Sequence, residues 1–327
     1  MSLDKLNEIL ESQNIPMSVK KTVKNLNMLG KEALNSYYDK SSSFYRNAQP
    51  GNLAHNFFAS PKEYPDLYHY TQSKSLRAIL KSKNFFIGSI NEMNDTEEMK
   101  HTFDMCCKCL SSLKATSDEI NEFKIEFIAT MIRFDVYVWS FNPNGNSMAM
   151  ERYGDVALGF SNQEVQERLT ERFTPMNLFE GDLKQGDAFV FPLKVNYDQK
   201  YQLDYLFPII RVALACIQNM KIDPFDMKRI LKDSMVALYL LSLCFKRYEI
   251  REENEVRFLI LRVVTDGTTQ EDLLFNNRRM VKVGIDDKIL KSIIINHNWD
   301  GKEKALSDIV RKYGFMDTEI KKTTIPY

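Results

Sequence analysis

The sequence is poor in glycine, with 12 glycines in 327 residues, and no glycine-rich loop precedes a predicted helix. Rossmann dinucleotide-binding domains and P-loop NTPases hold phosphate groups in loops of that kind, so the sequence disfavours both classes. It also lacks the Gly-x-Ser-x-Gly elbow of serine hydrolases. Chemistry built on these common motifs is therefore not expected.

Histidine and cysteine are too few and too poorly spaced to predict a metal site. The chain has four histidines and five cysteines, and three of the cysteines crowd into residues 106–109 with only His101 nearby. A structural zinc site needs four ligands at suitable spacing. We therefore expect no bound metal and interpret the cysteines as reduced thiols on buried helices.

Positive and negative charges cancel, because 44 Lys and Arg residues balance 44 Asp and Glu residues. No net field therefore argues for a nucleic-acid partner. Three basic stretches could contact phosphates locally, or could simply form solvated surface. These stretches are Lys228-Arg229, Arg278-Arg279 with Lys282, and Lys321-Lys322.

Long apolar runs are also missing. The most apolar stretch, residues 235–245, is too short to span a bilayer and is flanked by charge. The first residues lack the basic region and apolar core of a signal peptide. We expect a cytoplasmic protein with no membrane partner.

Residues 1–60 are interpreted as a helical N-terminal appendage to a core domain that occupies residues 61–327. Apolar residues recur at helical spacing from Val19 to Leu34, and Ser18 can cap that helix. The polar stretch from Ser41 to Asn52 is typical of a linker or of a loop that wraps the next domain.

In the core, strands and helices interleave irregularly, which favours the α+β class. Strands are expected at residues 67–70, 84–90, 135–141, 155–160, 188–195, 256–264, 280–285 and 290–295, with an edge strand within 319–325. Two helices are expected at 208–220 and 224–248. We interpret residues 204–248 as a helical insertion that could form a lid or a partner surface.

Glu253, Glu255 and Arg257 are expected to share one face of a strand, because alternate strand residues point to the same side. Two neighbouring carboxylates raise one of their pKa values unless a cation intervenes, and Arg257 could supply it. A carboxylate in a cleft can bind a ribose hydroxyl and stabilise an oxocarbenium-like centre, as glycosidic cleavage requires. The alternative is a row of solvated charges, which the apolar run 256–264 disfavours.

Three other polar residues lie on or beside predicted strands. His69 is flanked by tyrosines, and its imidazole could donate a hydrogen bond to a ribose or an amide while accepting another. Ser140 could bind a ribose hydroxyl, and Tyr153 could stack on a flat heterocycle such as nicotinamide. Ordinary packing in a sheet or a core is the alternative for each of them.

The order of these motifs resembles a widespread bacterial family of uncharacterised proteins, domain-of-unknown-function family 2971. The resemblance covers the chain from about residue 65 onward and rests on His69-Tyr70-Thr71, Asn94-Asp95 with Glu97 or Glu98, Ser140-Phe141, Met148 to Tyr153-Gly154, Gly159-Phe160 and Glu253-x-Glu255-x-Arg257. The chain departs from the family where Ala149 follows Met148, because members often carry Trp there.

That family looks like a divergent branch of the ADP-ribosyltransferase fold of the His-Tyr-Glu type. The resemblance implies a split β-sheet core with NAD, used as a substrate, in the cleft. It implies that His69 contacts a ribose, that Tyr153 stacks on nicotinamide, and that Glu255, or less favourably Glu253, is the catalytic carboxylate. The remaining expected NAD-binding residues are Tyr70, Thr71, Ser140 and Arg257.

The resemblance therefore implies an NAD-dependent ADP-ribosyltransferase that acts as a toxin or effector in a phage-defence or toxin–antitoxin system, with an antitoxin protein as partner in the second case. The acceptor would be RNA, DNA or protein, and nucleic acid such as RNA is slightly favoured. Two alternatives keep the same fold. One is a non-catalytic module that senses a nucleotide or a phage component, and the other is an NAD glycohydrolase.

Overall fold

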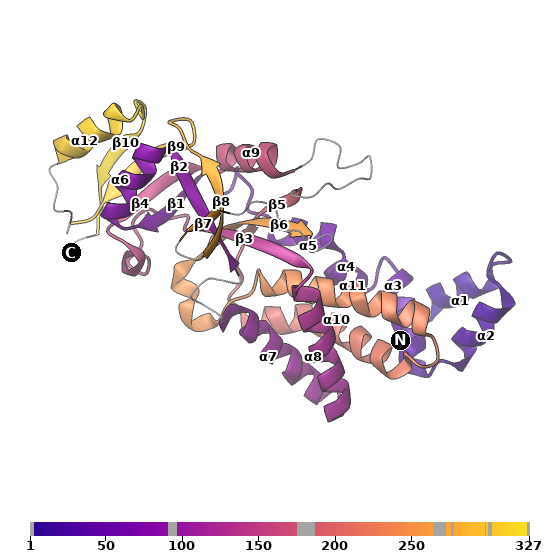
Figure 1. Cartoon of the computed structure of the whole chain (residues 1–327). Coiled ribbons are helices and arrows are strands. Elements are labelled where there is room, and N and C mark those ends of the chain that lie inside the picture. Colours follow the sequence, from indigo (N-terminus) through magenta and orange to yellow (C-terminus); the bar gives the residue numbers. More distant parts are fainter. Residues whose placement is uncertain are drawn as a thin grey trace. The chain divides into compact units, whose positions relative to one another are not determined.

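The computed structural model describes residues 3–90, 97–174, 187–263, 273–275, 278–297, 299 and 303–325, and it confirms the α+β class. The chain forms two compact units (Figure 1). The helical unit comprises Met1–Phe57, Asp95–Arg133 and Asn196–Tyr248, and the sheet unit comprises Phe58–Asn94, Phe134–Val195 and Glu249–Tyr327. The segments expected as an appendage and as an insertion are thus parts of one unit.

The helical unit is built around two long helices, α10 (Gln199–Asn219) and α11 (Pro224–Ser242), which pack against each other. The shorter helices of this unit are α1 (Asp4–Glu11), α2 (Met17–Asn25), α3 (Met28–Tyr38), α4 (Ser43–Ala48), α5 (Pro50–Phe57), α7 (Glu97–Ser112) and α8 (Ser117–Met131). Asp223 caps α11 by accepting a hydrogen bond from the backbone N–H of Asp226. Within the described part of the chain, no helix combines the length and apolarity needed to cross a bilayer.

Two predictions for the first sixty residues are wrong. The helix expected from Val19 to Leu34 is broken into α2 and α3, because the Asn27 side chain accepts a hydrogen bond from the backbone three residues on and starts a new helix. The expected linker forms α4 and α5 instead. Ser42 caps the first of these helices, and Pro50 is the first residue of the second.

Helix α10 begins at Gln199, earlier than the expected start at Pro208, and carries Pro208 in its interior. Asp198 caps the true start by accepting hydrogen bonds from two backbone N–H groups. Proline has no N–H, so one carbonyl in the preceding turn loses its helical partner. Asn47 donates a hydrogen bond to the neighbouring Tyr205 carbonyl at 2.9 Å, so a tertiary contact supports the helix near this point.

The sheet unit contains a sheet of order β5-β6-β3-β2-β8-β7 and a sheet of order β1-β4-β9-β10. Their strands are β1 (Asp66–Thr71), β2 (Asn84–Ser89), β3 (Phe134–Phe141), β4 (Val156–Ser161), β5 (Ala188–Lys194), β6 (Val256–Val263), β7 (Leu273–Phe275), β8 (Arg278–Gly284), β9 (Leu290–Ile295) and β10 (Glu319–Lys322). The helices of this unit are α6 (Ser73–Ser82), α9 (Asn162–Phe173) and α12 (Glu303–Lys312). Every expected strand is present, and β10 lies at a sheet edge as predicted; β7 was not predicted.

The two sheets meet between β1 and β3. Tyr68 of β1 and Asn142, just after β3, exchange backbone hydrogen bonds of 2.8 and 2.9 Å. Away from this bridge, β1 pairs with β4, whereas β3 pairs with β2 and β6. Strand β6 lies between β5 and β3 in its sheet, and its residues from Val256 to Arg262 are all buried, which confirms the prediction of a strand covered on both faces. The polar residues at the bridge therefore lie where the two sheets separate.

Candidate functional site

The polar residues singled out in the sequence gather in the sheet unit, around the end of β3. Ser140 lies one residue before the last residue of β3, and it pairs in register with Arg257 of β6. His69 lies on β1 and contacts Ser140. Glu253 and Glu255 come from the segment that leads into β6, and Tyr153 ends the short 3-10 helix η2 (Glu151–Tyr153) before β4.

Asn142 connects this end of β3 to its neighbours, and the sequence analysis did not single it out. The side chain is 2% exposed. Its Nδ2 donates a hydrogen bond to the Glu253 carbonyl at 2.5 Å, and its Oδ1 accepts one from the Asn144 N–H at 2.6 Å. Together with the backbone bridge to Tyr68, these bonds link β1, β3, the following turn and the segment before β6. The sequence signal that could have identified Asn142 is its position as a polar residue at the end of a strand, just before Pro-Asn-Gly.

Glu253 does not lie on the expected strand face, which corrects the sequence-based expectation. It ends the 3-10 helix η3 (Tyr248–Glu253), and Asn254 follows with a φ of 39°, in the left-handed region. The chain therefore turns between the two carboxylates. Glu253 accepts a hydrogen bond from the Tyr153 hydroxyl at 2.6 Å and forms an ion pair with Arg152.

Glu255 and Arg257 form a buried two-point ion pair. The guanidinium donates from Nε to Oε1 at 3.0 Å and from Nη2 to Oε2 at 2.6 Å. Such paired, charge-assisted hydrogen bonds fix the orientation of a carboxylate as well as its charge. The side chains are 4% and 2% exposed. Arg257 thus supplies the cation expected beside Glu255, and it holds that carboxylate in one orientation.

His69 is a neutral ring whose tautomer is defined by its partner. Its Nδ1 lies 2.9 Å from the Ser140 carbonyl oxygen, and because a carbonyl can only accept, Nδ1 carries the proton. The rings of Phe85 and Phe141 contact the imidazole edge-on, at centroid distances of 4.7 and 6.1 Å. Burial lowers the pKa of His69 to about 4. At neutral pH the ring therefore keeps Nε2 as a hydrogen-bond acceptor.

This lowered pKa predicts an acid-dependent loss of stability. In the native state the His69 ring stays neutral down to a pH of about 4, whereas in the unfolded chain it has its ordinary pKa of 6.5. As the pH falls from there to about 4, the free energy of unfolding should drop by about 3 kcal/mol through this residue. His69→Asn retains an N–H donor for Ser140 and does not titrate. In urea unfolding at neutral and acid pH, we expect the variant to lose less stability than the wild type; parallel losses would contradict the burial of His69.

Tyr70 and Thr71 hold the loop that carries Tyr153. The Tyr70 hydroxyl donates to the Asn144 carbonyl at 3.0 Å and accepts from the Ser147 N–H at 2.8 Å, and burial raises the pKa of Tyr70 to about 12. The backbone of Thr71 lies so close to Gly154 that an added Cβ would come within 2.0 Å of its carbonyl oxygen. These contacts require glycine directly after Tyr153.

Arg152 is a site residue that the sequence analysis missed. Its guanidinium carbon lies 4.8 Å from the centroid of the Tyr153 ring, and its Nη2 donates to the Tyr153 hydroxyl at 3.0 Å. Tyr153 is 46% exposed, and burial followed by the hydrogen bond to Glu253 raises its pKa. In the sequence, only the position of Arg152 directly before Tyr153 pointed to it. Its contacts with Tyr153 and Glu253 depend on how η2 is placed in the fold.

Several expected features lie outside this arrangement. Asn94 and Asp95 fall outside the described residues, as do the side chains of Glu97 and Glu98. In the part of the chain that the structure describes, no group of three or more His, Cys, Asp or Glu side chains is placed to hold a metal ion.

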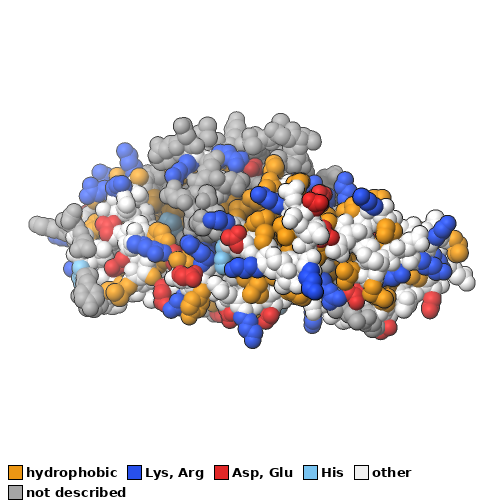
Figure 2. All heavy atoms as spheres, turned by 90° about the horizontal axis from the view of Figure 1, so that it is seen from below, with side chains coloured by type: hydrophobic (Ala, Val, Ile, Leu, Met, Phe, Trp, Pro, Cys, Tyr) orange, Lys and Arg blue, Asp and Glu red, His pale blue; other side chains and the backbone are white. Residues whose placement is uncertain are grey.

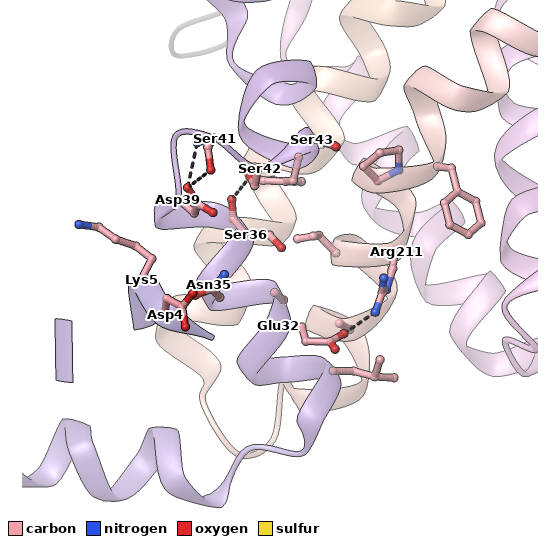
Figure 3. Close-up of a pocket in the computed structure, with 17 residues that line it drawn as sticks. Asp4, Lys5, Glu32, Asn35, Ser36, Asp39, Ser41, Ser42, Ser43 and Arg211 are labelled. Atoms are coloured by element: carbon pink, nitrogen blue, oxygen red, sulfur yellow. Dashed lines mark hydrogen bonds and ion pairs between the residues drawn. The ribbon is translucent and has the colours of Figure 1, made fainter. Parts of the chain in front are cut away.

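A separate pocket of about 470 Å³ lies in the helical unit (Figure 3). Its lining includes Glu32, Asn35, Asp39 and Arg211, and Glu32 and Arg211 form an ion pair with each other. None of the predicted site residues lines it. Volume alone does not define the chemistry of a site, so the convergent polar groups at the end of β3 are the stronger candidate.

No family model matches the chain, and no match was found among curated proteins or among solved structures. The argument for function therefore rests on the residues, on their arrangement and on the resemblance of their motifs described above.

Proposed function

We propose that the sheet unit is an NAD-dependent ADP-ribosyltransferase that breaks the nicotinamide–ribose bond and transfers ADP-ribose to a macromolecule. The supporting observation is a chain of contacts at the end of β3: His69 bonds to Ser140, and Ser140 pairs in register with Arg257, which holds Glu255. Tyr153 bonds to Glu253, two residues before Glu255. These residues come from three distant parts of the sequence. They are the residues that the family resemblance assigns to ribose binding, nicotinamide stacking and catalysis.

Each side chain has a role that fits its surroundings. Neutral His69 uses Nδ1–H to hold the Ser140 carbonyl and offers Nε2 as an acceptor for a ribose hydroxyl. The partly exposed Tyr153 ring offers a surface for nicotinamide. Arg257 holds the Glu255 carboxylate in one orientation through two hydrogen bonds.

In the proposed reaction, the bond between the ribose C1′ and the nicotinamide nitrogen breaks, and nicotinamide leaves with the bonding electron pair. The Glu255 carboxylate stabilises the oxocarbenium-like centre that forms at C1′ and accepts a hydrogen bond from a ribose hydroxyl. An acceptor oxygen or nitrogen then forms the new bond to C1′, and its proton passes to Glu255. The protein supplies positioning and one negative charge to this step.

The basic stretches that favoured a nucleic-acid acceptor are partly occupied by acidic partners. Arg229 pairs with Asp226, and Arg279 pairs with Asp135 at 3.0 Å. Lys321 pairs similarly with an acidic neighbour on β10. On the face shown in Figure 2, Lys and Arg side chains are spread among acidic and apolar ones and do not form one patch. We retain RNA, DNA and protein as acceptors, and the experiment below separates them.

The proposed transfer is tested with purified protein, NAD labelled on the adenylate phosphate, and bacterial lysate divided among nuclease and protease treatments. We expect label in a macromolecule, and we expect Glu255→Gln to lower the rate of labelling by a factor of about one hundred or more. Glu252→Gln is the matched control, because Glu252 is 72% exposed and lies three residues away. Its labelling should equal that of the wild type. Label that persists in Glu255→Gln would contradict the assigned role of Glu255.

A non-catalytic NAD- or nucleotide-sensing module is the second candidate, and one observation favours it. Glu253 and Glu255 are only 5% and 4% exposed, and each pairs with an arginine. A module would bind NAD without consuming it.

Release of free ADP-ribose without macromolecular labelling would instead indicate a glycohydrolase.

A further inference from the structure

We propose that Glu253 and Arg152 are positioning residues for Tyr153, and that Glu255 alone of the two glutamates is the catalytic carboxylate. This inference rests on the proposed NAD site, because positioning of Tyr153 matters for catalysis only if its ring meets the nicotinamide. It separates two carboxylates that the sequence could not distinguish.

The three side chains form a closed set of contacts. The Tyr153 hydroxyl donates to Glu253 Oε1 at 2.6 Å, Arg152 donates to the same hydroxyl at 3.0 Å, and Arg152 forms an ion pair with Glu253 Oε1. The guanidinium also lies over the Tyr153 ring, with its carbon 4.8 Å from the centroid. A ring held at its hydroxyl and on one face has little rotational freedom, yet 46% of Tyr153 remains exposed for a ligand.

Glu253 is itself held firmly, as a positioning residue requires. Its carbonyl accepts a hydrogen bond from the buried Asn142 side chain at 2.5 Å, and Asn142 is bridged to Tyr68 of β1. The left-handed Asn254 then turns the chain, so that Glu255 enters β6 with a different neighbour, Arg257. The two carboxylates are therefore built into different contacts: one orients an aromatic ring, and the other is oriented by an arginine.

The charge of Glu253 is also committed to its contacts. Oε1 accepts hydrogen bonds from both the tyrosine hydroxyl and the arginine, so this oxygen is occupied by the contacts that orient the ring. In Glu253→Gln, the amide would lose the ion pair and weaken the hydrogen bond to Tyr153. The expected consequence is poorer NAD binding without loss of the catalytic charge.

The test uses full-length protein labelled with carbon-13 at the tyrosine Cζ, with the Tyr153 signal identified by its absence in Tyr153→Phe. We expect Glu253→Gln to move this signal and to lower the pKa of Tyr153, and Glu252→Gln to change neither. In NAD turnover, Glu253→Gln should raise KM about tenfold while kcat changes less than about threefold. Glu253→Asp should recover part of the binding. Arg152→Gln, at a side chain that is 54% exposed, is the second variant if Glu253→Gln folds poorly.

The outcomes separate this inference from the proposed function. An unchanged Tyr153 signal in Glu253→Gln would overturn the positioning role. A fall in kcat as large as that of Glu255→Gln, with KM unchanged, would also overturn it and make Glu253 catalytic. If Glu253→Gln shifts the Tyr153 signal but the wild-type protein consumes no NAD, the Glu253–Tyr153 contact is upheld and the transferase is rejected.

Discussion

Replacing Arg257 with methionine should lower the free energy of unfolding by about 3–5 kcal/mol. Arg257 and Glu255 are 2% and 4% exposed and share two hydrogen bonds. Removing the arginine leaves the Glu255 carboxylate buried without this cation, and water cannot reach it to compensate. Urea unfolding followed by circular dichroism measures the change, and the loss should be smaller at acid pH, where Glu255 can take up a proton.

A double replacement, Glu255→Met with Arg257→Met, should recover most of that stability, because removing both charges also removes their desolvation cost. Arg251→Met is the control, since Arg251 is 44% exposed, and it should change the free energy of unfolding by less than about 0.5 kcal/mol. A double variant that is less stable than Arg257→Met would show that the loss in the single variant does not come from an unpaired buried carboxylate.

Glu255→Gln should lower kcat for NAD cleavage by about 10²–10⁴ and leave KM nearly unchanged. Glutamine fills the same volume and keeps an oxygen for Arg257, but it lacks the charge that stabilises an oxocarbenium-like centre. Nicotinamide released by purified protein, in the presence of the acceptor fraction that the labelling experiment identifies, gives both parameters. The variant must first be shown to be folded under the assay conditions, because Arg257 loses the charge of its partner.

Glu252→Gln again serves as the matched control for this kinetic prediction. A similar fall in both variants would indicate a general effect of charge near η3, and an unchanged kcat in Glu255→Gln would remove Glu255 from the reaction. Either result would assign the buried pair a purely structural role.

The strands were predictable from sequence because their signal is local. Runs such as 134–141 and 290–295 are rich in β-branched and aromatic residues and end at polar turns, and β3 and β9 lie there. Helix boundaries were less predictable. The periodic pattern from Val19 to Leu34 hides the cap at Asn27, and Pro208 marks no helix end because α10 continues through it.

The residues of the candidate site could be singled out from the sequence, but their pairing could not. The strand ladder places Ser140 beside Arg257, which local pattern and register can indicate. The separation of Glu253 from Glu255 depends on a left-handed Asn254 that no pattern marks. The roles of Asn142 and Arg152 depend on tertiary contacts across about one hundred residues of sequence, and propensity carries no information about such contacts.

The most direct test of the central claim is a calorimetric titration of NAD into Glu255→Gln, which should bind NAD without consuming it. We expect saturable binding of one NAD per chain, weakened about tenfold or more when Tyr153→Ala is added. Folded Glu255→Gln that binds no NAD, or equal affinity with and without Tyr153→Ala, would contradict an NAD site at the end of β3.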